Sequence, residues 1–317
     1  MPSNTVTREW VLCSAAGLAL FIACLAFPAL SPVILMICPF PQALLTYGRG
    51  VRAGTLSVLC VSSALFAAFL AVPSVIYVLS IGSVGILLGA AARKFNGADA
   101  LLAGIICSLC CKLAATYFLY RATGFNLLSP DPAGVEQTLL ALFESRMATL
   151  PGIDASALRE DISSRVRYIL LLIPFNMILF SSLEVFLSYT LSSRVHAARG
   201  GEAFFKLPPF GKWSFPKNIL ATLMVALVCG YVSQRNPDAY LLAQVSANLG
   251  TLAWTLFAVQ GLAVAYYFME ARGFPKAVRV AIILLTPITQ YLGSLFSIVG
   301  IIDMGFDLRK RARRKQP

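Results

Sequence analysis

The chain has 317 residues and a net charge of +12, with 58% apolar and only 13% charged residues. Soluble domains contain about 25% charged residues, so this composition excludes an ordinary water-soluble globular protein. The stretches 11–47 and 54–92 hold no charged residue. Because about 20 apolar residues cross a bilayer, and backbone groups in lipid must be paired within each segment, the sequence predicts an all-α, polytopic transmembrane helical bundle.

Nine apolar blocks follow one another along the chain. They cover 10–28, 31–47, 54–72, 74–92, 98–120, 168–191, 218–232, 239–269 and 281–304. The block 31–47 is short and contains three prolines, and the block 281–304 is interrupted by Pro287. We expect one of these two to be re-entrant or broken, and favour the last, which leaves about eight spans.

The loops between the blocks predict the orientation through their lysine and arginine content. Basic residues follow the second, fourth and sixth blocks, whereas the segment 121–167 holds five basic and six acidic residues. If the last block is the irregular one, every basic segment lies in the cytoplasm. The expectation is one membrane domain, 1–317, with an external segment at 121–167, a cytoplasmic loop at 192–217 and a cytoplasmic tail at 305–317.

The external segment is expected to contain an amphipathic helix. Asp131 can cap its start and Pro132 suits its first turn. Apolar residues then recur at helical spacing, at Val135, Leu139, Leu142, Phe143, Met147 and Leu150. Such a helix lies on the membrane surface or over the mouth of a cavity, and shielding of neighbouring spans is the simpler alternative.

Small residues recur at four-residue intervals in two of the blocks, which allows another helix to approach closely. The first block has Ala15, Ala19 and Ala23, and the fourth has Gly85 and Gly89. We interpret the glycine pair as packing inside the chain. The alanine stripe lies on a terminal helix and either packs inside the chain or faces a partner membrane protein.

Five polar residues inside the spans are candidate ligand-binding residues, because polar groups in the bilayer face a cavity or a partner. They are Lys112, Asn176, Glu184, Asn248 and Gln260. At 1.5 Å per residue, Lys112 and Asn176 each lie roughly 12 Å from the outer ends of their blocks, and Glu184 about 24 Å. This difference predicts that Lys112 meets Asn176 or extends outward, and does not pair directly with Glu184. Asn248 belongs to a polar stripe that is explained equally well by contacts between helices.

Enzyme, metal and nucleic-acid signals are weak. The spacing of Cys107, Cys110 and Cys111 resembles a metal-binding pattern, but no second cysteine pair follows and His196 is the only histidine. Packing residues are the simpler interpretation. No HExxH, GxSxG or P-loop motif is present, so we expect neither an enzyme nor a cofactor. The basic tail lacks interleaved aromatic residues, which favours attraction to anionic lipid over binding of nucleic acid.

Three stretches carry a family resemblance: LPPFGKWSFPKN at 207–218, NLGTLAWTLFAVQGLAVAYYF at 248–268 and GIIDMGFDLRK at 300–310. Their order and spacing resemble the YybS-like predicted membrane proteins of bacteria, domain-of-unknown-function family 2232. That family is similar in helical layout to the S components of energy-coupling-factor vitamin transporters and to the rod-shape protein MreD. In S components an AxxxA stripe on the first helix docks the coupling subunit, and Ala15, Ala19 and Ala23 match that stripe.

The resemblance implies a multi-pass protein of the bacterial inner membrane that binds a small solute, as the capture subunit of a transporter does. The alternative is a non-transporting scaffold that recruits cell-envelope or division proteins, and an intramembrane enzyme is a third reading. The expected partners are the lipid bilayer, a membrane protein that contacts the first helix, and a small-molecule solute.

Overall fold

The computed structural model describes residues 4–69, 71–124, 126, 134–135, 137, 141, 155–201, 204, 207–236, 239–286 and 290–314. Over these residues the secondary structure is helical and contains no strand, which confirms the all-α prediction. Contacts between α-carbons divide the chain into two compact units, Met1–Leu207 and Pro208–Pro317. The expected single membrane domain therefore comprises two units.

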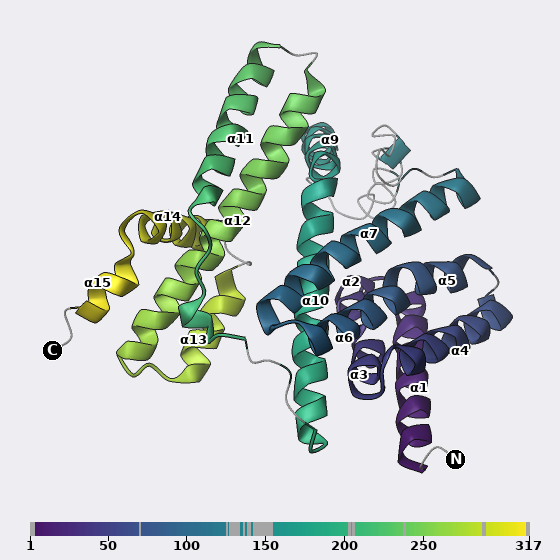
Figure 1. Ribbon diagram of the computed structural model, residues 1–317. Coiled ribbons are helices and arrows are strands. Elements are labelled where there is room, and N and C mark those ends of the chain that lie inside the picture. Colours follow the sequence, from purple (N-terminus) through teal and green to yellow (C-terminus); the bar gives the residue numbers. More distant parts are fainter. Residues whose placement is uncertain are drawn as a thin grey trace. The chain divides into compact units, whose positions relative to one another are not determined.

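The first unit holds ten helical segments among its described residues (Figure 1). They are α1 (Asn4–Ala26), α2 (Ser31–Leu35), α3 (Phe40–Arg49), α4 (Val51–Phe69), α5 (Ala71–Ile76), the π-helical turn η1 (Tyr77–Gly82), α6 (Ser83–Lys94), α7 (Gly97–Thr123), α9 (Ala155–Leu171) and α10 (Ile173–Ala198).

The short helix α3 forms the centre of the first unit. A turn at 36–39 separates it from α2, and every residue from Pro41 to Thr46 is buried. Helices α1, α4, α6 and α10 all contact it. A Cβ atom added at Gly85 or Gly89 of α6 would collide with the α3 backbone, at the carbonyl oxygens of Pro39 and Ala43 respectively. This close approach confirms that the glycine pair packs inside the chain.

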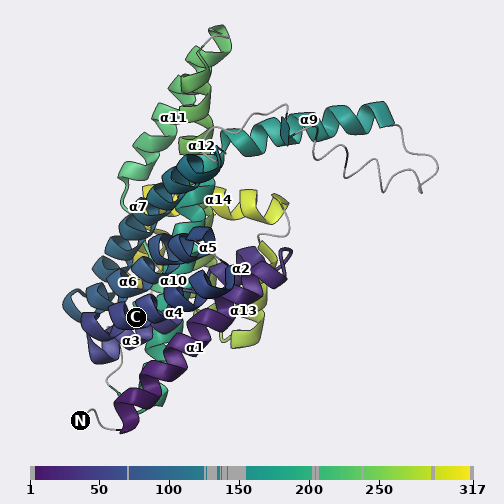
Figure 2. The same ribbon diagram turned by 90° about the vertical axis from the view of Figure 1, so that its right-hand side faces the viewer.

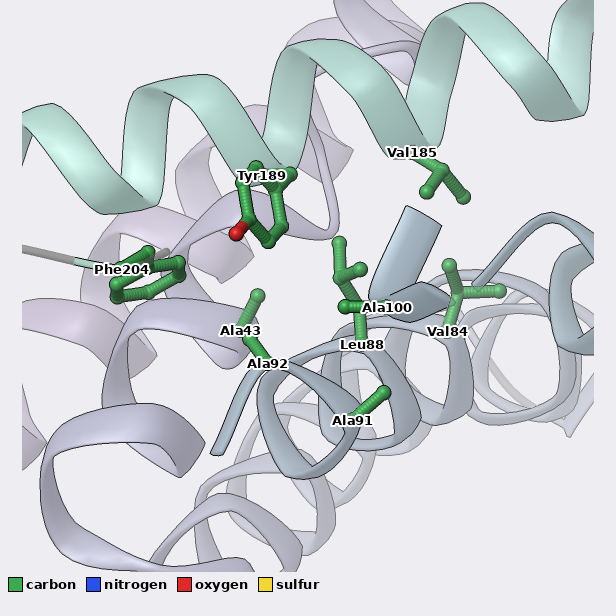
Figure 3. Close-up of a cluster of buried hydrophobic side chains, with 9 residues drawn as sticks. All are labelled: Ala43, Val84, Leu88, Ala91, Ala92, Ala100, Val185, Tyr189 and Phe204. Carbon is green, nitrogen blue, oxygen red and sulfur yellow. The ribbon is translucent and has the colours of Figure 1, made fainter. Parts of the chain in front are cut away.

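A cluster of buried apolar side chains joins α3, α6, α7 and α10 (Figure 3). Figure 3 shows Val185 and Tyr189 of α10 facing Leu88 of α6. The ring centroid of Tyr189 lies 5.4 Å from that of Phe204, which follows α10 in the chain. The cluster thus holds α10 against the α3–α6 pair, and this packing fixes the position of the polar residues on α10.

The chain is helical directly before α10, where the sequence analysis expected part of the external segment. Helix α9 ends at Leu171, and α10 starts at Ile173 with Pro174 in its first turn, a position that suits proline. The chain bends sharply between the two helices (Figure 2). Most of the expected amphipathic helix lies outside the described residues, although 134–135, 137 and 141 are helical.

The second unit holds η2 (Phe210–Lys212), α11 (Asn218–Arg235), α12 (Tyr240–Ala271), α13 (Lys276–Leu285), α14 (Gln290–Phe306) and α15 (Leu308–Arg314). Helices α11 and α12 form an antiparallel hairpin, and α14 packs across α12 (Figure 1). The crossing of α12 and α14 occurs at Gly261 and Gly300. A Cβ atom at Gly261 would overlap the carbonyl oxygen of Phe296, and one at Gly300 would overlap that of Phe257. The backbones touch there because neither residue has a side chain.

Among the described residues, eight helical segments are long and apolar enough to cross a membrane. They begin at residues 7, 31, 51, 71, 97, 173, 218 and 240. The expected count of about eight spans is therefore confirmed. The block 281–304 supplies none of them, because it is divided between α13, with 10 residues, and α14, with 17 residues.

Candidate functional site

An ion pair joins the two oppositely charged residues that lie deepest in the spans of the first unit. Lys112 of α7 pairs with Glu184 of α10 where these two helices contact each other. The Lys112 ammonium also donates a hydrogen bond to Ser108 Oγ at 2.6 Å, and Ser108 Oγ donates to Glu184 Oε2 at 2.7 Å. Three polar side chains from two helices thus form one closed network.

Burial explains why these groups are paired. The Glu184 side chain is 7% exposed, the Lys112 side chain is 24% exposed, and Ser108 is completely buried. A charge in an apolar interior is costly unless a counter-charge and hydrogen bonds compensate it. Lys112 has three N–H groups, of which two bind acceptors among the described residues, so one is left over in this network for another acceptor.

The prediction that Lys112 does not pair with Glu184 was wrong, because the sixth span begins five residues later, and the fifth ends three residues later, than their apolar blocks. Helix α10 begins at Ile173, after the break that follows α9, and Glu184 lies eleven residues beyond that start. Lys112 lies eleven residues before the end of α7 at Thr123. At 1.5 Å per residue both are about 16 Å from those ends, and they are level with each other. Among the described residues no hydrogen bond joins Lys112 to Asn176.

A cavity of about 500 Å³ lies beside the ion pair. It is lined by Pro32, Leu35, Met36, Lys112, Val135, Leu170, Ile173, Asn176, Met177, Phe180 and Glu184. Three of the predicted ligand-binding residues, Lys112, Asn176 and Glu184, therefore line one cavity. Most of the other lining residues are apolar, and the volume falls within the range of about 300–1,000 Å³ usual for small-molecule sites.

Lys112 also lines a smaller cavity of about 240 Å³. Ser80 of the π-helical turn η1 lines it, together with the buried Thr116 of α7. Lys112, Ile173 and Met177 border both cavities. π-Helical turns occur often at functional sites, because the extra residue in the turn displaces neighbouring side chains.

Ser108 was not among the candidates predicted from the sequence, although a signal for it was present. Ser108 precedes Lys112 by four residues, and residues at this spacing lie on the same face of a helix. A hydroxyl one turn before a lone lysine in an apolar span is therefore placed to accept a hydrogen bond from that lysine. Its second role, as donor to Glu184, depends on how α7 and α10 pack, and this is not visible in the sequence.

The other two candidate ligand-binding residues belong to the second unit. Asn248 donates a hydrogen bond to the carbonyl oxygen of Gln244 within α12, at 2.7 Å. Gln260 is 2% exposed and bonds to Phe215 and Asp303. The ligand-binding role expected of Asn248 and Gln260 stays a prediction.

The described residues of the first unit leave most of the alanine stripe of α1 uncovered. Ala15 and Ala19 are exposed and Ala23 is half-buried. The opposite face of α1 packs inward, where Phe21 and Cys24 belong to an apolar cluster with α4. The stripe is thus a face of small side chains that the surrounding helices of this unit do not fill.

Comparisons with known proteins agree with the resemblance carried by the three stretches. The profile of the family described as "Predicted membrane protein (DUF2232)" matches residues 15–304. The "Uncharacterized protein YybS" of Bacillus subtilis (strain 168) is 21% identical over 142 residues, which are 45% of this chain and 45% of that protein. The chain thus spans about half the length of the curated relative that it matches. No solved structure matches it. Because the matched region covers most of the chain, this protein belongs to the DUF2232 family of predicted membrane proteins.

Proposed function

We propose that the protein captures a small solute in the cavity beside Lys112 and Glu184, in the manner of a transporter's substrate-binding component. The ion pair at the wall of this cavity carries the proposal. Apolar contacts would suffice to pack α7 against α10, and a buried ion pair is often no more stabilising than apolar residues of similar volume. Charged residues in membrane interiors are associated with substrate and ion pathways.

The chemistry of the site favours a largely apolar solute with a carbonyl or carboxylate oxygen. Lys112 has one N–H group that the network does not use, which would donate to such an oxygen. Asn176 offers a second polar contact on the same cavity wall. Val135 also lines the cavity and would contact the bound solute.

The test is native mass spectrometry of the gently purified protein. The variant Lys112→Met/Glu184→Leu removes both charges at once, and we expect it to lose a bound small molecule that the natural protein retains. The control is Asp161→Asn/Arg165→Gln, which removes an exposed ion pair of α9 at 2.7 Å with the same change in charge. Retention of the molecule by the first variant, or its absence from the natural protein, would contradict solute binding at this cavity.

We also propose that the alanine stripe of α1 is the contact face for a partner membrane protein. Its exposure within the first unit supports this role, since small side chains permit close helix packing in lipid. Ala19→Leu is expected to abolish co-purification of the partner while the protein stays folded. Ala67→Leu, at an exposed alanine of α4, is the control. Two results together would favour the scaffold function: the Ala19→Leu variant loses the partner, and the natural protein never retains a solute.

The proposed orientation has both termini in the cytoplasm of a bacterial cell. Eight spans would return the chain to its starting side, and the lysine and arginine bias of the loops assigns that side to the cytoplasm. Alkaline phosphatase fused after Gln137 should be active, whereas fusions after Leu207 or Arg311 should be inactive. An active fusion after Arg311 would mean that the number of crossings is odd.

A further inference from the structure

The three stretches that carry the family resemblance meet at one place in the second unit. Gln260 comes from the stretch 248–268, Asp303 and Arg309 from 300–310, and the loop 211–215 from 207–218. Together they surround a cavity of about 390 Å³ that lies wholly within this unit. The solute cavity proposed above lies in the other unit, so the two sites are distinct.

A hydrogen-bonded network forms the inner wall of the cavity. Asp303 Oδ2 accepts from Gln260 Nε2 at 2.6 Å and from the Arg309 guanidinium at 2.8 Å. Arg309 also donates to the carbonyl oxygens of Gly211 and Trp213, at 2.9 and 2.7 Å. Asp307 has a positive φ of 48°, which turns the chain after α14 so that Arg309 can reach back to Asp303.

Among the described residues, one atom of Asp303 lacks a hydrogen-bond partner. Asp303 is 3% exposed, and its Oδ1 atom accepts no hydrogen bond from the residues that the structure describes. A buried carboxylate oxygen without a donor is costly, and such groups in folded proteins are normally satisfied. Asp303 lines the cavity, so a ligand in the cavity would supply the missing donor after a small movement of this carboxylate exposes Oδ1.

The rim of the cavity is positively charged. Lys212, Lys217 and Lys310 line it, and all three are exposed. Asp307 partly neutralises two of them, at 3.9 Å from Lys217 and 3.5 Å from Lys310. With Asp303 and Arg309 included, four cationic and two anionic residues line the cavity, a net excess of two positive charges. Such a rim suits an anionic group with several oxygen acceptors.

Helix ends and aromatic residues place this cavity at the level of the lipid headgroups. The loop that forms it leads directly into α11, and α14 ends beside it. The ring centroids of Phe210 and Trp213 lie 5.2 Å apart, and those of Phe210 and Tyr266 lie 5.7 Å apart. Tryptophan and tyrosine gather at the interface between membrane and water, where basic pockets between helices bind headgroups.

We propose that this cavity binds a phosphoethanolamine group. The primary ammonium of the group donates a hydrogen bond to Asp303 Oδ1, and its phosphate contacts the rim lysines. The two charges of this group match the two parts of the site, since the ammonium supplies the missing donor and the phosphate neutralises the lysines. Arg309 serves mainly to hold the loop and Asp303, because three of its N–H bonds already go to these protein acceptors. The group can belong to a phospholipid or to a soluble phosphate ester.

The decisive comparison is between phosphatidylethanolamine and phosphatidylcholine, which carry the same net charge and differ in the three methyl groups that remove the N–H donors. Native mass spectrometry of the full chain, titrated with each lipid, should show about tenfold stronger retention of phosphatidylethanolamine, the effect of one hydrogen bond to a charged group. Equal retention of the two lipids would overturn the ammonium site at Asp303 without affecting solute capture in the first unit.

Matched charge variants test the phosphate site. Lys212→Gln/Lys217→Gln should weaken retention of phosphatidylethanolamine about 25-fold, since each lysine near an anionic headgroup contributes about 1 kcal/mol, or roughly fivefold. Arg272→Gln/Lys276→Gln removes the same charge from exposed positions outside the cavity and should leave retention unchanged. Equal loss in both variants would show a general electrostatic attraction of the lipid to the protein and overturn the site.

A competition experiment distinguishes the two sources of the group. Displacement of the lipid by soluble phosphoethanolamine at equal concentration would identify a soluble phosphate ester as the ligand. Retention of the lipid would identify a membrane phospholipid as the ligand.

Discussion

Glu184→Leu is expected to lower the free energy of unfolding by about 3–5 kcal/mol, because it leaves the Lys112 ammonium in the apolar interior without its counter-charge. Ser108 would be the only remaining partner of that ammonium in the network. The measurement is denaturation of the purified protein in detergent micelles, followed by the loss of helical signal. A change below about 1 kcal/mol would mean that solvent reaches Lys112 and that the pair is not buried in the membrane.

The double variant Lys112→Met/Glu184→Leu is the control for this effect. It removes both charges and replaces them with apolar side chains of comparable volume, which is often neutral or stabilising for buried ion pairs. We therefore expect its stability to return close to that of the natural protein. The difference between the single and double variants measures the cost of the unpaired charge, independently of any solute.

Substitution of the glycines at the crossing of α12 and α14 is expected to have the second large effect. Gly261→Ala and Gly300→Ala each place a methyl group on a backbone carbonyl of the opposite helix. Alanine favours a helix over glycine by about 1 kcal/mol, but overpacking costs about 1–3 kcal/mol or more where the backbone must move. The helices must separate, so the net effect on stability should be a loss.

Two other glycines of α14 serve as controls for this prediction. A Cβ atom at Gly293 or Gly305 of α14 meets no atom within 4 Å. Gly293→Ala and Gly305→Ala should therefore be neutral or slightly stabilising, because only the helix propensity changes. Denaturation of all four variants in detergent separates the two groups. Equal behaviour of all four would show that α12 and α14 do not cross at their glycines.

Much of the architecture was accessible from the sequence. The apolar blocks predicted about eight spans, since the cost of placing unpaired backbone groups in lipid forces long apolar segments to be helical. Gly85 and Gly89 predicted a close helix contact, because residues four apart share one face of a helix. The positions of Lys112, Asn176 and Glu184 within spans made each of them a candidate ligand-binding residue, although the estimated depths separated Glu184 from the other two.

Tertiary structure decided which of these residues meet. Lys112 pairs with Glu184 because α10 begins after the break between Leu171 and Ile173. The apolar spacing does not show this break, although Pro174 lies beside it. Asp303 meets Gln260 only because α14 packs across α12 at Gly261 and Gly300. The sequence determines how long a helix is and which face is polar, since these depend on neighbouring residues. The crossing of two helices depends on side-chain shapes over long separations in the chain, so only the folded structure shows which polar groups come within bonding distance.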